Sequence, residues 1–153
     1  MLVFLIVILL LAALLEYLSL RGGLACIDAD FELSKNRTEA FAPVELTTAI
    51  RNTGLLPISY GMLRISFPLS AALPDGADVH PDQRSRLLTD VFRLWGHRSV
   101  ERRISFFMEK RGVYAVSGRE LARGDFLGLQ LTSGRFDVRR TLLVIRRDWK
   151  ARR

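Results

Sequence analysis

Residues 44–52 read VELTTAIRN, and this stretch decides the fold class. Every second side chain from Val44 to Ile50 would face one way and is mostly apolar, whereas the side chains between them are polar except at Ala49. A period of two is typical of a β-strand with one buried face. The turn-forming triplet 52–54 follows directly. The sequence therefore predicts a strand that ends at a tight turn.

The same alternation recurs along the chain at intervals of about ten residues, with Gly and Pro between the stretches. Beyond the first twenty residues no long helical pattern accompanies it, and no internal repeat is visible. This arrangement predicts a mainly β fold, an Ig-like antiparallel β-sandwich of about seven strands. The predicted strands cover roughly residues 29–33, 44–50, 58–67, 91–94, 100–108, 113–124 and 138–145.

Several local features of the sequence lead to further structural predictions. Residues 69–90 have the weakest periodicity, and 82–90 is interpreted as a helical turn or a loop. Trp95 is expected to cover an edge of the core. Arg102 falls on the apolar face of its strand, which indicates either a β-bulge or a sheet edge. Residues 110–112 predict a tight reversal between two paired strands.

The first twenty residues, MLVFLIVILLLAALLEYLSL, contain one charge, at Glu16. Twenty helical residues rise about 30 Å, which is the thickness of a bilayer's hydrocarbon core. We expect an uncleaved transmembrane anchor, with a cleaved secretory signal as the alternative, because no Lys or Arg precedes the apolar core. Arg21, Lys35 and Arg37 follow it, so the positive-inside rule predicts a cytoplasmic soluble domain on a single-pass membrane protein.

These observations divide the chain into four parts. We expect a transmembrane anchor at 1–20, a juxtamembrane linker and edge strand at 21–40, a β-sandwich domain at 41–146 and a basic tail at 147–153. Cys26 is the single cysteine, so an internal disulfide is excluded. It is interpreted as a plain juxtamembrane thiol, with lipidation as the alternative.

The formal net charge is +7, and only three of the 23 basic residues are lysine. Genome composition explains the arginine bias most simply, and no motif that mixes basic and aromatic residues predicts nucleic-acid binding. The basic residues near the C-terminus form either a solvated end or a contact with anionic lipid head groups. The candidate lipid contacts are Arg146, Arg147, Lys150, Arg152 and Arg153.

Catalytic motifs are missing from the sequence. His80 and His97 lie in turn contexts without carboxylates at metal-ligand spacing, so no metal, cofactor or small-molecule substrate is predicted. Asp125 opens a turn, where a carboxylate ordinarily accepts backbone N–H groups. An enzyme that uses Asp125 with Arg111 or Arg123 is the least favoured reading. The residues assigned to structural turns are Asn52, Gly54, Arg111, Gly112, Gly118, Gly124, Asp125 and Gly128.

Several segments resemble a prokaryotic membrane-protein family, domain of unknown function 58. The run 110–118 (KRGVYAVSG) and the run 123–129 (RGDFLGL) are similar to its Arg-Arg-Gly-x-Tyr-x-Leu-Gly strand and Gly-Asp-Pro-Phe-Gly-Leu-Phe turn, although the family usually has proline where Phe126 stands. Residues 50–57 (IRNTGLLP) look like its Arg-Asn-x-Gly-x-x-Pro strand end. Family members are often encoded beside MoxR-type AAA ATPases.

The resemblance implies a membrane-tethered accessory module. From the apolar anchor, the sandwich pattern and the missing catalytic motifs we expect a non-enzymatic interaction or scaffold module. Its expected partners are the lipid bilayer and a protein, and the resemblance suggests a MoxR-type AAA ATPase or another membrane protein. The alternative is a surface-binding or sensor domain that uses its arginine-rich face and tail on anionic lipid.

Overall fold

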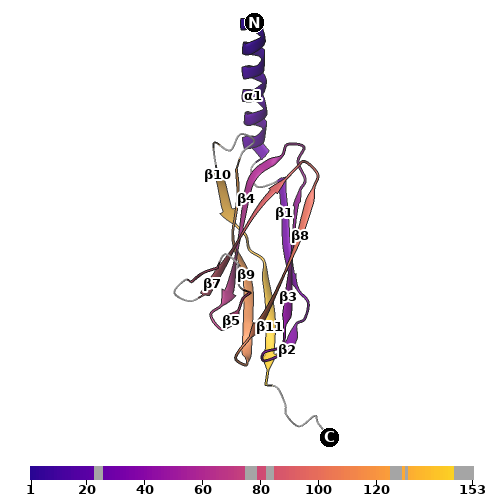
Figure 1. Ribbon diagram of the computed structural model, residues 1–153, viewed down its shortest axis with the longest axis vertical. Helices are drawn as coiled ribbons and strands as arrows, with labels where there is room; N and C mark the ends of the chain where they lie inside the picture. Colours follow the sequence, from indigo (N-terminus) through magenta and orange to yellow (C-terminus); the bar gives the residue numbers. More distant parts are fainter. Residues whose placement is uncertain (23–25, 75–78, 82–84, 125–128, 130, 147–153) are drawn as a thin grey trace.

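The computed structural model describes residues 1–22, 26–74, 79–81, 85–124, 129 and 131–146, without the side chains of 19, 20, 22, 80 and 81. One helix precedes an elongated body of strands, and the helix lies at the opposite end of that body from the last residues of β11 (Figure 1). The elements are α1 (Leu2–Gly22), β1 (Ile27–Leu33), β2 (Arg37–Glu39), β3 (Val44–Asn52), β4 (Ile58–Pro68), β5 (Ala71–Ala72), β6 (Val79–Pro81), β7 (Ser85–Leu94), β8 (Ser99–Met108), β9 (Gly112–Gly124), β10 (Leu131–Arg135) and β11 (Arg139–Ile145).

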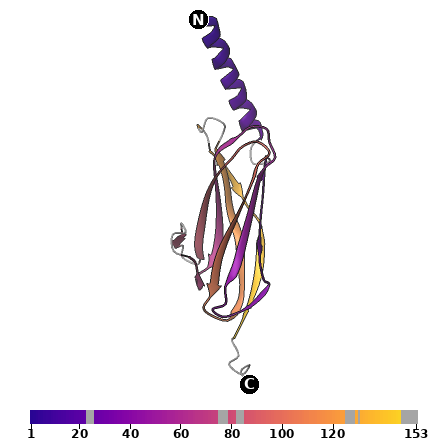
Figure 2. The same cartoon turned by 45° about the vertical axis from the view of Figure 1, so that its right-hand side comes forward.

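The strands form two sheets packed face to face, which is the predicted β-sandwich (Figure 2). One sheet has the order β1-β3-β8-β5, and the other has the order β2-β11-β9-β4-β7-β6, with β10 beside β9. The stretch that decides the fold behaves as predicted, because Val44, Leu46, Thr48 and Ile50 are all buried. β1 lies at the edge of its sheet, as expected for residues 29–33.

The sandwich is not wholly antiparallel, because the chain changes sheets between β1 and β2. β1 pairs antiparallel with β3, and β2 pairs parallel with β11. The crossing is fixed on both sides: the Ser34 N–H donates to the Glu45 carbonyl at 2.9 Å, and the Leu143 N–H donates to the Asn36 carbonyl at 2.9 Å. One continuous segment therefore joins the two layers at the end far from the helix.

The core lies between the sheets and consists of inward-facing aliphatic and aromatic side chains. Phe67 and Phe106, from opposite sheets, meet edge to face with their ring centroids 5.2 Å apart. Phe31 and Phe136 make a second pair at 6.0 Å. Burial of apolar surface at roughly 25 cal/mol per Å² makes this core the main source of stability.

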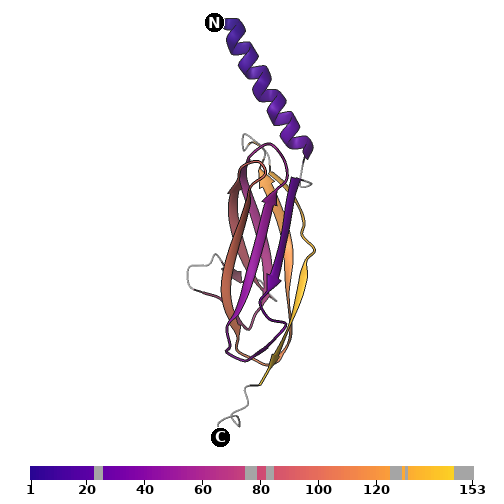
Figure 3. The same ribbon diagram turned by 90° about the vertical axis from the view of Figure 1, so that its right-hand side faces the viewer.

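Helix α1 stands outside the core and projects from one end of the sandwich (Figure 3). Apart from Glu16 and Arg21, its described side chains are mostly apolar and cover all sides of the helix, and nearly all of them are exposed. The helix extends to Gly22, two residues beyond the predicted anchor. Within the described residues, no helical stretch combines the length and the apolar character that crossing a membrane requires.

Several local expectations were wrong. Residues 85–94 form one ten-residue strand, β7, in place of the helical turn or loop predicted for 82–90. The described residues hold eleven strands instead of about seven, because the alternation of apolar and polar residues did not predict the short strands β2, β5, β6 and β10. Trp95 is 75% exposed and covers no core edge.

The reversal at residues 110–112 does not join paired strands. β8 belongs to the four-stranded sheet and β9 to the other, so this connection crosses between the layers. Gly112 has a φ of +152°, a backbone conformation that glycine adopts without a Cβ penalty. The sequence identified the reversal correctly but could not identify the sheets that it joins.

Candidate interaction surfaces

The loops at the end of the sandwich nearest the helix form the first candidate surface. Residues 53–57 connect β3 to β4, residues 95–98 connect β7 to β8, and Leu129 lies just before β10. We call these three segments the helix-proximal loops. They share one end of the body because Ile58 pairs with Leu94 and Gly124 pairs with Leu131. Helix α1 emerges from the same end (Figure 1).

Asn52 holds two of these loops together. Its side chain is 1% exposed, and its amide nitrogen donates to the Leu56 carbonyl at 2.9 Å and to the Trp95 carbonyl at 3.2 Å. Its amide oxygen accepts from the Gly54 N–H at 3.0 Å. A buried amide with its donors and acceptor engaged is a rigid connection, because each lost partner would leave a desolvated polar group.

Further backbone contacts complete this arrangement. The His97 N–H donates to the Gly54 carbonyl at 3.1 Å, and the Thr53 N–H donates to the Cys26 carbonyl at 2.8 Å. His97 has a φ of 57°, in the left-handed region that is sparsely occupied by residues other than glycine. Cys26, half-buried beside Gly54, is thereby tied to the loop, so the start of β1 is held against these turns.

The helix-proximal loops present large apolar side chains to the surroundings. Leu55 is 82% exposed, Trp95 is 75% exposed and Leu129 is 74% exposed. Single exposed apolar residues are ordinary on protein surfaces, whereas a large contiguous apolar patch marks an interaction site. With three large apolar side chains exposed on its loops, this end is a candidate for such a site. The sequence analysis did not predict this surface. A large apolar residue inside each of these connections was the feature that could have indicated it.

The opposite end carries a second, basic surface. A pocket of about 510 Å³ is lined there by Ala40, Glu109, Lys110, Arg111 and Arg146. Tyr114 supports its rim, because its hydroxyl donates to the Lys110 carbonyl at 3.0 Å. Exposed Phe41 lies at the same end, where its N–H donates to the Met108 carbonyl and its ring lies 6.0 Å from that of Phe107. This end combines positive charge with an exposed aromatic ring.

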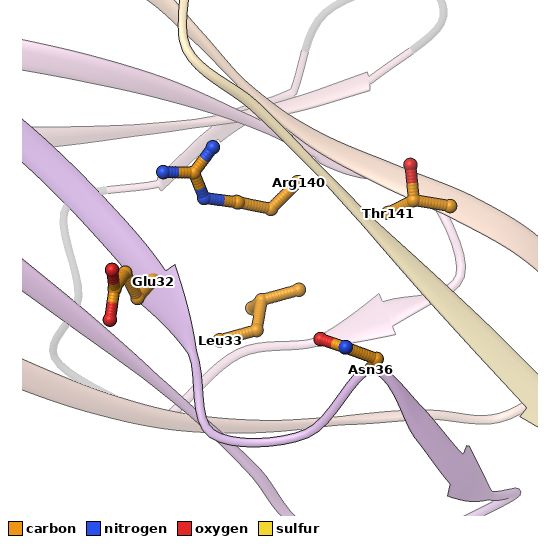
Figure 4. Close-up of a pocket in the computed structure, with 5 residues that line it drawn as sticks. All are labelled: Glu32, Leu33, Asn36, Arg140 and Thr141. Atoms are coloured by element: carbon orange, nitrogen blue, oxygen red, sulfur yellow. The ribbon is translucent and has the colours of Figure 1, made fainter.

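A second, smaller pocket of about 300 Å³ opens between β1 and β11 and is lined by Glu32, Leu33, Asn36, Arg140 and Thr141 (Figure 4). The arginine in this lining is already engaged within the protein. Arg140 donates from Nε to the Phe31 carbonyl at 3.1 Å and from a terminal nitrogen to Asp30 at 3.2 Å. We conclude that Arg140 links the two sheets where β11 faces β1 at the side of the sandwich.

Asp90 and Arg102 form an ion pair across the sandwich. Asp90 comes from β7 and Arg102 from β8, on opposite sheets, and a second Arg102 nitrogen donates to the Val91 carbonyl at 3.1 Å. Burial raises the pKa of Asp90, and the Arg102 charge opposes that rise. β8 pairs with β3 without any register shift, so Arg102 marks no bulge. The short strand β5 pairs only with Phe107 and Met108, so β8 is a sheet edge at Arg102.

The predicted turn residues divide into described and undescribed positions. Asn52, Gly54, Arg111, Gly112 and Gly124 lie at strand ends or in connections. Gly118 lies inside β9, where the register with β4 shifts, and a Cβ there would come within 2.4 Å of the Phe136 carbonyl oxygen. The predictions for Asp125 and Gly128 fall outside the described residues.

The residues considered for chemistry are not brought together by the described structure. Arg123 is buried at the end of β9, whereas Arg111 is exposed at the other end of that strand. His97 lies in a surface turn, and the side chain of His80 lies outside the described residues. Among the side chains that are described, no three His, Cys, Asp or Glu residues gather to hold a metal ion.

The basic C-terminal segment begins at the end away from the helix. Arg146 lies there beside the pocket of Lys110 and Arg111. The remaining candidate lipid contacts, Arg147, Lys150, Arg152 and Arg153, fall outside the described residues. β9 has 13 residues, so the two ends of the sandwich are separated by roughly 40 Å.

No protein-family model matches the chain, and no curated protein matches it either. Solved structures do share the fold. A cohesin module from a Clostridium perfringens ATCC13124 family 33 glycoside hydrolase is 7% identical, with a TM-score of 0.55 over 80% of this chain and 98% of its own. The seventh ScaB type I cohesin from Pseudobacteroides cellulosolvens is 10% identical, with a TM-score of 0.54 over 82% of this chain and 97% of its own.

AvmM, which catalyses macrocyclization in alchivemycin A biosynthesis, is also similar. It is 10% identical, with a TM-score of 0.51 over 82% of this chain and 92% of its own. Identities this low establish the fold alone. The body of this protein is accordingly a β-sandwich of the kind found in cohesin modules, and an enzyme can be built on the same sandwich.

Proposed function

We propose that the protein is a membrane-anchored, non-enzymatic interaction module: α1 holds the chain in the bilayer, and the sandwich presents its far end to a protein partner. The proposal rests on one observation: the apolar side chains of the helix lie outside the sandwich core. Its apolar side chains surround the axis on all sides, and none of those described enters the sandwich core. Such a helix requires an apolar environment, and lipid supplies one.

The length of the helix is compatible with this role. Twenty-one residues rise about 31 Å, close to the thickness of the hydrocarbon core. The proposed span includes Ser19 and Leu20, whose side chains lie outside the described residues. Arg21 follows the apolar stretch at the helix's C-terminal end, so the proposed orientation places the sandwich in the cytoplasm.

The partner-binding role is supported by the basic end of the sandwich. Lys110, Arg111 and Arg146 surround a pocket beside exposed Phe41, and aromatic and arginine side chains are enriched in protein interfaces. The partner proposed from the family resemblance, a MoxR-type AAA ATPase or another membrane protein, would present acidic groups to this end.

The alternative function, a lipid sensor that acts through the basic tail, is less consistent with the geometry. Arg146 lies at the end away from the helix, roughly 40 Å from the membrane when the sandwich stands upright. Charges that far from a surface are screened, since the Debye length at physiological salt is about 8 Å. Contact between the tail and the same membrane would require the sandwich to lie flat.

Site-specific photo-crosslinking of the full chain in native membranes tests the binding role. A photoreactive amino acid in place of Phe41 should give a defined protein adduct, whereas the same group at Thr132, on the exposed side of β10, should not. Reversing the charges of Lys110 and Arg111 should abolish the adduct. Adducts of equal yield at both positions, or none at either, would refute a specific partner at the basic end.

A further inference from the structure

The apolar residues on the helix-proximal loops lie outside the core of the sandwich. Leu55, Trp95 and Leu129 are each more than 70% exposed, although inward-facing positions nearby are filled by apolar side chains. Asn52 fixes the loops of Leu55 and Trp95 against each other through the backbone carbonyls of Leu56 and Trp95. A surface held rigidly in this way is suited to contact an apolar environment.

The position of these loops relative to the helix identifies that environment. Helix α1 ends at Gly22 and β1 begins at Ile27, which leaves four residues between them. Four residues span at most about 14 Å when fully extended. The start of β1 is hydrogen-bonded to the turn after β3, because the Thr53 N–H donates to the Cys26 carbonyl. The loop of residues 53–57, and the loop of residues 95–98 that Asn52 joins to it, are therefore held close to the C-terminal end of the helix.

From these distances and exposures we infer that the helix-proximal loops insert into the head-group region of the bilayer, with Trp95, Leu55 and Leu129 as the inserted side chains. The inference rests on the proposed anchoring by α1. Trp is favoured at this depth because its apolar ring lies among acyl chains while its N–H reaches water. The docked loops would fix the orientation of the sandwich, so its basic end points away from the membrane.

The charges around these loops fit an anionic membrane. Arg21, Arg51 and Arg98 are exposed at this end, and Asp28 is the nearest exposed acid in β1. Basic residues beside inserted apolar side chains add attraction to anionic head groups, which weakens as salt is added. A protein partner seated on the same loops would compete with this contact, and the two occupants give different experimental results.

Depth-dependent fluorescence quenching tests the inference on the full chain. The protein has two tryptophans, so Trp149→Phe leaves Trp95 as the single emitter. In nanodiscs with anionic lipid, Trp95 should emit at shorter wavelength than an exposed indole and lose most of its emission to lipids brominated near the head group. A second variant, Phe41→Trp with Trp95→Phe and Trp149→Phe, places the emitter at the far end and should not be quenched.

The outcomes separate the inference from the anchoring that it requires. Quenching of Trp95 but not of the indole introduced by Phe41→Trp supports the inference. A chain that remains in the nanodisc while Trp95 is quenched by aqueous iodide and not by brominated lipid overturns the inference and leaves the anchoring intact. Protection of Trp95 from both quenchers assigns the loops to a protein contact and also overturns it. A chain that does not enter nanodiscs at all contradicts the anchoring itself.

Discussion

Replacing Asn52 with alanine should destabilise the protein through lost hydrogen bonds at the helix-proximal end, while the packing of the hydrophobic core stays intact. The substitution removes three hydrogen bonds, to the Leu56 carbonyl, the Trp95 carbonyl and the Gly54 N–H. At about 1 kcal/mol each, their loss should reduce the free energy of unfolding by about 3 kcal/mol. For a domain of this size we expect Tm to fall by roughly 10 °C.

Chemical and thermal denaturation of the full chain in detergent micelles would measure this change. Thr53→Ala is the matched control, because it removes one hydrogen bond from the exposed neighbouring side chain and should cost less than about 1 kcal/mol. Asn52→Asp preserves shape but replaces the amide donor with a carboxylate that faces two carbonyls, so it should destabilise at least as much as alanine. A loss below about 1 kcal/mol for both Asn52 variants would refute the reasoning.

Three further predictions test other parts of the fold. Gly118→Ala should destabilise the protein by about 2 kcal/mol or more, because its Cβ would lie 2.4 Å from the Phe136 carbonyl oxygen; unchanged urea unfolding would contradict this. Arg140→Ala should cost about 1–2 kcal/mol through loss of its bonds to Phe31 and Asp30, whereas Arg139→Ala, at an exposed position, should cost little; equal effects would contradict the assignment. The raised pKa of Asp90 means that the folded state favours the protonated carboxyl, so the contribution of Asp90 to stability should be fully present below its ordinary pKa of 3.8 and decline as pH rises through the raised value. Carboxyl NMR titration should show this pKa rising further in Arg102→Ala, and a lower pKa there would contradict the ion pair.

The sequence predicted best those elements whose side chains alternate locally. β3 could be predicted directly because its fully buried positions alternate with partly buried or exposed ones through Ile50. The first part of β7 was missed because the polar residue Asp90 occupies an inward-facing position between Leu88 and Phe92. Arg102 interrupts β8 in the same way, and these two interruptions are each other's partners across the sandwich. A pairing between residues on different sheets leaves no periodic signal in either strand.

The candidate surfaces were harder to predict than the strands. Asn52 and Gly54 were assigned to a turn from local chemistry, but the contact of Asn52 with Trp95 joins residues 43 positions apart. Trp95 itself was expected to cover an edge of the core. Its exposure depends on the loop that Asn52 and His97 shape, which only the folded chain reveals.

The central claim, that α1 anchors the sandwich in a membrane, is tested most directly by carbonate-washed liposome flotation of the full chain. The unaltered chain should float with the lipid after the wash. A matched variant with Ile8→Arg and Leu11→Arg places two charges near the helix centre at about 2.5–3.5 kcal/mol each, so it should remain at the bottom of the gradient while the sandwich stays folded. Flotation of both chains, or of neither, would contradict the account.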